Sequence, residues 1–212
     1  MIIIPKKLSW LKIILSFRDS ALLAIWKRVL FATALAALVT LLHVQWGWFK
    51  LSLTPLPFTF VGLALSIFLG FRNSTSYDRF WEGRKLWGSL INTSRNLARS
   101  IQTLVKSEQA EEQEAVQQLH QQWIYYLIAY VHALRCHLRG DAWEPLQALI
   151  SNEDYLHLRK QTNPPMFLAF RLSEMTQETY QKKWLNTHHL PLIEELISEL
   201  INIQGACERI KS

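Results

Sequence analysis

Cysteine, glycine and proline are scarce in this chain of 212 residues, which contains two, seven and seven of them. Cys136 and Cys207 lie far apart in the sequence and form no CxxC pair. This pattern excludes a disulfide framework and a cysteine-rich zinc site, so we expect two reduced thiols in a cytosolic part of the protein. The first five residues lack the apolar core of a cleavable signal peptide.

Motifs of the common enzyme classes are also missing, because the sequence has no GxGxxG, GxxxxGK[ST], HExxH or GxSxG pattern. The histidine pairs His132 with His137 and His188 with His189 do not have the i, i+4 spacing usual for two metal ligands on one helix face. Adjacent acidic pairs point to different sides of a helix, unlike an acid/base pair. We therefore predict that the protein is not an enzyme and has no catalytic residues, metal or cofactor, and we predict no nucleic-acid partner.

Charged residues are absent from two long apolar stretches, residues 29–49 and 51–71, which Lys50 alone separates. Each stretch has about the 20 residues that a transmembrane helix needs. Helices of soluble proteins are seldom apolar on all sides, so two membrane spans are favoured over a buried helical hairpin.

Basic residues flank this pair of spans. Six precede the first span, four follow the second, and between the spans lies Lys50 alone. By the positive-inside rule, both ends of the chain are expected in the cytoplasm. Residues 8–17 combine apolar side chains with the basic Lys12, which is typical of a segment along the inner membrane surface or of a frayed terminus.

The rest of the chain is polar and has helical periodicity, with no strand-like alternation. We predict an all-α fold in three parts: an N-terminal interfacial segment (1–28), two transmembrane helices (29–71) and a cytosolic helical domain (72–212). Within the last part we expect helices at 123–138, 141–150, 166–185 and 190–210, with 107–122 as a solvated helical region or connection. The chain stops without a helix-stop signal, which suggests a longer natural chain.

Two stripes run along the second span. Large apolar side chains recur at i, i+4 and i+8 on one face, and small residues recur one position earlier. The large residues are Leu63, Ile67 and Phe71, and the small ones are Gly62, Ser66 and Gly70. Small residues at this spacing allow neighbouring helices to approach closely, and a ring of the large ones would form a hydrophobic constriction. Packing inside one bundle, or against lipid, gives the same pattern.

Residues 67–88, IFLGFRNSTSYDRFWEGRKLWG, and residues 205–212, GACERIKS, resemble the bacterial bestrophin-like proteins. The resemblance implies a pentamer of four-span subunits, with the last two spans following residue 212, and an axial pore. It also implies an apolar neck formed by three residues of the second span, which here are Leu63, Ile67 and Phe71. A second, cytosolic constriction would fall near His188, His189, Leu190 and Leu192.

The resemblance implies a subunit of a channel for monovalent ions, with chloride or another anion as the family default. A cation channel and a non-conducting membrane scaffold or accessory subunit remain alternatives. The implied partners are membrane lipids, permeant ions and further copies of the chain, in a bacterial inner or plasma membrane with the N-terminus and cytosolic domain inside. The basic residues after the second span favour membrane anchoring with local ion pairs over an anion-attracting vestibule.

Overall fold

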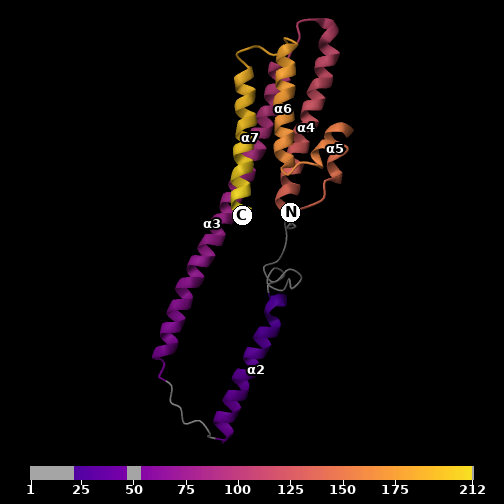
Figure 1. Ribbon diagram of the computed structural model, residues 1–212. Helices are drawn as coiled ribbons and strands as arrows, with labels where there is room; N and C mark the ends of the chain where they lie inside the picture. Colours follow the sequence, from indigo (N-terminus) through magenta and orange to yellow (C-terminus); the bar gives the residue numbers. More distant parts are fainter. Residues whose placement is uncertain (1–21, 47–53, 212) are drawn as a thin grey trace, which may run out of the picture. The chain divides into compact units, whose positions relative to one another are not determined.

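The computed structural model describes residues 22–46 and 54–211, and every regular element within them is a helix (Figure 1). The predicted interfacial segment 8–17 and the link at Lys50 lie outside the described residues. The main helices are α2 (Leu22–Trp46), α3 (Leu56–Leu104), α4 (Gln113–Arg139), α5 (Asn152–Leu158), α6 (Pro164–Gln181) and α7 (Leu190–Lys211). Two short 3₁₀ turns, η2 (Ala110–Glu112) and η3 (Glu144–Leu146), precede α4 and α5. The prediction of an all-α fold is confirmed.

The chain divides into two compact units, residues 1–65 and 66–212. Helix α2 belongs to the first unit, and its stretch Ile25–Val44 has a mean hydropathy of 1.7 with none of it buried. The hydroxyls of Thr33 and Thr40 donate to the carbonyls of Val29 and Ala36, both at 2.8 Å. These bonds satisfy the polar groups within the helix itself, as a lipid environment requires. By length and composition, α2 can cross a membrane.

Helix α3 is continuous over 49 residues and changes character along its length. It begins at Leu56 with Pro57 in its first turn, where the missing N–H of proline costs no hydrogen bond. Its first part is apolar and exposed, and it is the second helix long and apolar enough to span a membrane. At 1.5 Å per residue it extends over about 70 Å, so its later turns reach well beyond one bilayer.

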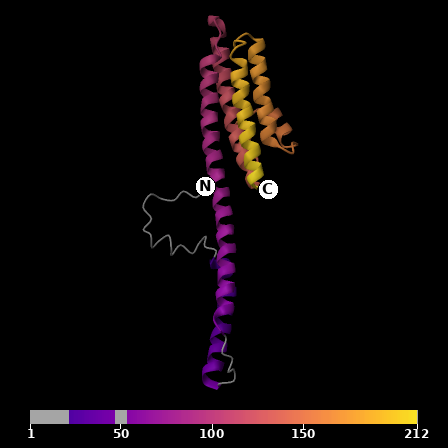
Figure 2. The same ribbon diagram turned by 90° about the vertical axis from the view of Figure 1, so that its left-hand side faces the viewer.

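The second unit contains a bundle in which the later turns of α3 pack with α4, α6 and α7 around one hydrophobic core. Leu97 of α3, Leu134 of α4, Leu172 of α6 and Leu200 of α7 are all fully buried. Buried Tyr130 of α4 donates its hydroxyl to the carbonyl of Leu200 at 2.7 Å. Figure 2 shows α3 and α6 at opposite edges of this bundle, with α4 and α7 between them.

The segment between residues 107 and 163 departs most from the sequence-based expectation. Helix α4 begins at Gln113, ten residues before the predicted start, because Val116 and Leu119 are buried and extend its apolar face. Residues 141–150 hold only the turn η3, so the helix predicted there is wrong. The nearby helix is α5, whose cap is Ser151, with its hydroxyl accepting from the amide of Asp154 at 3.1 Å.

Helices α6 and α7 are close to their predicted positions. Asn163 caps α6 by accepting from the amide of Met166 at 3.2 Å, so α6 begins at Pro164, two residues before the predicted start. It ends at Gln181, before the predicted Leu185, because Lys183 has a left-handed backbone with φ of 61°. Helix α7 confirms the predicted helix 190–210 within one residue.

Candidate functional site

The stripe Leu63, Ile67 and Phe71 lies on one continuous helix, as the sequence predicts. The three side chains are 59%, 50% and 69% exposed within the chain. Residues four apart on a helix lie one above another, so they form one apolar ridge about 12 Å long. Such a ridge is unfavourable in water and needs lipid or another protein surface against it.

The small residues Gly62, Ser66 and Gly70 form the adjoining face of α3. Apart from the helix itself, no atom of the chain lies within 4 Å of the position that a Cβ would take at Gly62 or Gly70. Another helix could therefore approach the α3 backbone closely here. The packing role of these three residues stays a prediction.

Aromatic and basic side chains follow the apolar ridge. The rings of Tyr77 and Trp81 are stacked at 6.5 Å between centroids, and the Lys85 ammonium lies 5.9 Å from the Trp81 ring. Of the two carboxylates in this stretch, Glu82 forms an ion pair with Arg209 of α7 at 2.5 Å rather than with a neighbouring arginine. The expected local ion pairs of this stretch are not found in the described part of the chain.

The predicted cytosolic constriction, residues 188–192, covers the turn before α7 and the first three residues of α7. The amide of His188 donates to Oδ1 of Asn186 at 2.9 Å, and the Nδ1 atom of His189 is buried without a hydrogen-bond partner. Leu190 packs against the bundle core, whereas Leu192 is 49% exposed. Of the two leucines, Leu192 is thus the one whose side chain is available to another surface.

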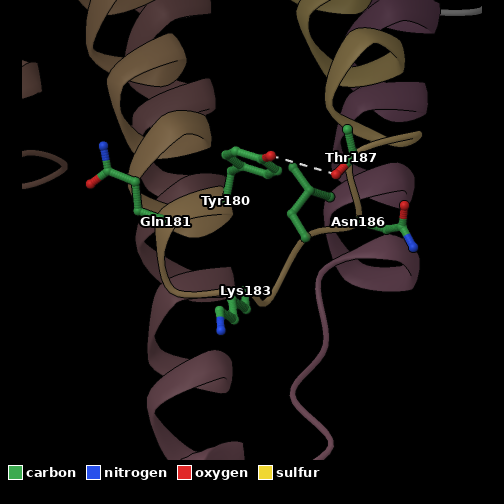
Figure 3. Close-up of a pocket in the computed structure, with 6 residues that line it drawn as sticks. Tyr180, Gln181, Lys183, Asn186 and Thr187 are labelled. Carbon is green, nitrogen blue, oxygen red and sulfur yellow. Dashed lines mark hydrogen bonds between the residues drawn. The ribbon is translucent and has the colours of Figure 1, made fainter.

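A cleft of about 410 Å³ lies beside this turn, between the end of α6 and the loop to α7. Its lining residues are Tyr180, Gln181, Lys183, Leu185, Asn186 and Thr187. Figure 3 shows Tyr180 and Thr187 facing each other, their hydroxyls 3.5 Å apart, while Gln181 and Asn186 point away on opposite sides. Because its polar side chains do not converge, the cleft has no arrangement suited to a ligand.

Metal-binding side chains do not cluster in the part of the chain that the structure describes. No three His, Cys, Asp or Glu side chains there could hold a metal ion. Cys136 and Cys207 are both free and buried. Burial, with a smaller contribution from the charge of Glu208, raises the pKa of the Cys207 thiol and makes it a poor nucleophile.

The C-terminal turns of α7 form a hub of polar contacts that sequence reasoning missed. The Glu208 carboxylate accepts from Gln204 at 2.9 Å and from Asn163 at 3.3 Å, and it lies 3.5 Å from His137. Lys211 donates to the carbonyl of His137 at 3.0 Å. Together with the Arg209 ion pair, these contacts join α7 to α3, α4 and α6. The two segments that resemble the bacterial bestrophin-like proteins therefore meet in space.

Comparison with known proteins agrees with this architecture. A family model described as bacterial/fungal bestrophin protein matches residues 1–212. A protein of Nostoc sp. named as a voltage-dependent anion channel-forming protein is 38% identical over 205 residues, which cover 96% of this chain and 65% of the relative. A relative in Ralstonia nicotianae with the same description is 30% identical, over 99% of this chain and 67% of its own length.

Solved structures give the same result. A mutant of a bacterial bestrophin homologue from Klebsiella pneumoniae has a TM-score of 0.77 and 26% identity, covering 88% of this chain and 67% of that one. A crystal structure described as a membrane protein has a TM-score of 0.76 and 28% identity, covering 87% of this chain and 66% of that one. The chain spans about two thirds of the length of these relatives. It is a membrane protein, and it belongs to the family of bacterial and fungal bestrophin proteins.

Proposed function

We propose that the chain is a subunit of an oligomeric membrane channel that conducts monovalent anions. The observation that carries the proposal is its 38% identity, over 96% of its length, to a relative named as a voltage-dependent anion channel-forming protein.

The neck of the pore is the apolar ridge of α3. When copies of α3 surround an axis, Leu63, Ile67 and Phe71 face inward and form three stacked apolar rings. The small-residue face beside the ridge lets adjacent α3 helices approach each other. The rings offer an ion no coordinating groups, so the neck acts as a hydrophobic barrier. Ions pass only when water fills the neck, and flow stops when the neck is dry. Five copies per ring follows from the family resemblance.

Charge beyond the neck favours anions. Arg72, Arg79, Arg84 and Lys85 follow the ridge on the same helix, and the nearest carboxylate with an ion pair, Glu82, is bound by Arg209. These four cations outnumber the two carboxylates of the stretch, Asp78 and Glu82, and a net positive charge near a low-dielectric passage raises the local concentration of anions. Because apolar rings do not distinguish the sign of an ion, this field is the feature that would select anions.

The cytosolic end of the pore is assigned to the start of α7. We propose that Leu192, as the exposed member of the candidate set with His188, His189 and Leu190, lines a second constriction. Replacing Leu192 by Ala should raise conductance at this level without disturbing the core, whereas Leu190 packs against the core and serves as the structural comparison.

Reconstitution in liposomes tests the function. Vesicles that contain the purified protein and a potassium chloride gradient should release chloride without ATP or substrate, and the reversal potential should follow the chloride gradient. A reversal potential that follows potassium would establish a cation channel. Absence of flux from protein that is correctly inserted and oligomeric would favour a scaffold or accessory subunit.

The orientation follows from the flanking charges. We place both ends of the chain in the cytoplasm, because basic residues precede the first span and follow the second. Reporter fusions at each end measure this directly, and a periplasmic signal from either end would contradict it.

A further inference from the structure

The bundle part of α3 has a basic outward face with no counterpart in the same chain. This face, formed by Gly88, Ile91, Arg95 and Arg99, points away from the core residues Leu90, Leu97 and Ile101. Ile91 is 48% exposed, and no acidic residue occurs between Gly83 and Ser107. In the described part of the chain, Arg95 and Arg99 take part in no ion pair. The face thus combines exposed apolar surface with uncompensated positive charge.

Helix α6 has an outward face of opposite charge. It begins with Met166 and Phe170, which are 43% and 57% exposed, and continues with Glu174 and Glu178. Glu174 is bound by Arg171 of the same helix, whereas Glu178 forms no ion pair with any described residue. From its N-terminal to its C-terminal end, the face of α6 is therefore first apolar and then acidic. In the same direction, the face of α3 is first apolar and then basic.

The two faces also lie at matching heights along the bundle. At one end, the amide of Lys106 after α3 donates to the carbonyl of Trp184 after α6 at 2.9 Å. Lys106 and Trp184 lie two and three residues beyond the helix ends Leu104 and Gln181, so these two ends are at similar heights. Counting back from them at 1.5 Å per residue places Ile91, Arg95 and Arg99 near residues 168, 172 and 176. Each is within two residues, about 3 Å along the helix, of the α6 set, Phe170, Glu174 and Glu178.

The other end of the bundle confirms that α3 and α6 run in the same direction. Helix α7 is antiparallel to both: Arg209 near its end contacts Glu82 of α3, and Gln204 contacts Asn163 at the start of α6. The two helices are therefore parallel to each other. Since α3 and α6 lie at opposite edges of the bundle (Figure 2), their complementary faces cannot meet within one chain.

We propose that the basic face of α3 docks on the acidic face of α6 of a neighbouring copy of this chain. The inference rests on the proposed ring of subunits. In such a ring the bundles are parallel to one axis, so residues at the same height in neighbouring subunits lie opposite each other. A contact between two different faces of identical subunits is the kind that closes a ring. Ile91 then packs on Phe170, Arg99 pairs with Glu178, and Arg95 reaches Glu174. Gly88 admits Met166, because no atom lies within 4 Å of its missing Cβ.

Crosslinking between differently tagged chains tests the interface. One chain carries Arg99→Cys and the other carries Glu178→Cys, and a short thiol crosslinker spans the roughly 8–10 Å between packed helix axes. The native Cys136 and Cys207 are buried, so the parent chain provides the background. The matched control combines Arg99→Cys with Ser198→Cys, an exposed position of α7. We expect at least about tenfold more mixed dimer from the first pair, since yield follows effective concentration.

Charge reversal adds a second, independent readout. Arg99→Glu and Glu178→Arg should each lower the oligomer fraction in light scattering, and the two together should restore it. The interface would be overturned if the oligomers crosslink through Ser198→Cys but not through Glu178→Cys. It would also be overturned if neither charge reversal changes the oligomer fraction. Both results would leave the channel proposal intact. A monomeric parent chain would overturn the interface together with the ring on which it rests.

Discussion

Replacing the whole apolar ridge by alanine gives the sharpest test of the neck. The triple variant Leu63→Ala, Ile67→Ala and Phe71→Ala removes the large side chains while leaving an apolar helix that still partitions into lipid. The three rings of the assembled pore become wider and wet more easily, so the barrier to ion passage falls. Flux into liposomes should rise by about tenfold or more, which corresponds to a barrier lowered by at least about 1.4 kcal/mol.

The structure separates this effect from damage to the fold. The three side chains are 59%, 50% and 69% exposed within the chain, so their loss creates no cavity in the bundle. Substitutions at exposed positions usually change the free energy of unfolding by no more than about 0.5 kcal/mol. By contrast, Leu97→Ala in the bundle core should cost about 2–5 kcal/mol. A thermal melt of the helical signal therefore shows whether the triple variant is still folded.

Alanine at Leu65 and at Leu69 provides the matched controls, because both residues are exposed on the opposite side of the same helix. These variants should leave flux close to that of the parent chain. If they alter flux while the triple variant conducts like the parent, then the pore-facing side of α3 has been assigned wrongly, and the neck assignment fails with it.

Three further predictions concern assembly and the bundle. Gly70→Leu should lower the oligomer fraction more than Leu69→Phe does, since a large side chain in the small-residue face holds helices apart; equal behaviour in size-exclusion with light scattering would contradict this. Lys183→Gly should stabilise the bundle by about 1 kcal/mol in a thermal melt, because φ of 61° strains any residue with a Cβ. Burial raises the pKa of Tyr130, so the neutral phenol stabilises the fold below pH 10 and that contribution is lost at higher pH. The free energy of unfolding of Tyr130→Phe should therefore fall less steeply above pH 10 than that of the parent chain. At neutral pH the variant should be less stable by about 1 kcal/mol, because it lacks the hydrogen bond to Leu200.

Sequence reasoning located the long helices because their signals are strong and local. An uncharged run of some 20 residues defines a span, and the 3.6-residue periodicity of 190–210 defines α7. It failed between residues 141 and 158, where the structure has only short elements. Asp141 has the chemistry of a helix cap, but Ser151 is the residue that accepts from a helix amide there. Which of two good caps is used depends on tertiary contacts, here the hydrogen bond from Tyr126 to Asp154 across α4 and α5.

The same distinction holds for the candidate site. The ridge of α3 could be predicted because i, i+4 geometry depends on one helix alone. The hub around Glu208 could not, because it joins residues from α4, α6 and α7 that are distant in sequence. The end of α6 was missed for another reason. A glycine normally occupies the left-handed position after a helix, and a lysine there gives no signal.

The continuity of α3 determines how the bundle can act on the neck. Glu82 lies 11 residues beyond Phe71, about 16 Å along the same helix, and Arg209 holds it at 2.5 Å. That ion pair is exposed, at 72% for Arg209 and 45% for Glu82, so it contributes at most about 1 kcal/mol. The buried residues Leu97 and Ile101 anchor α3 in the core far more strongly, since losing either side chain costs several times as much. A rearrangement of the bundle would therefore act on α3 chiefly through its packing in the core and much less through the ion pair.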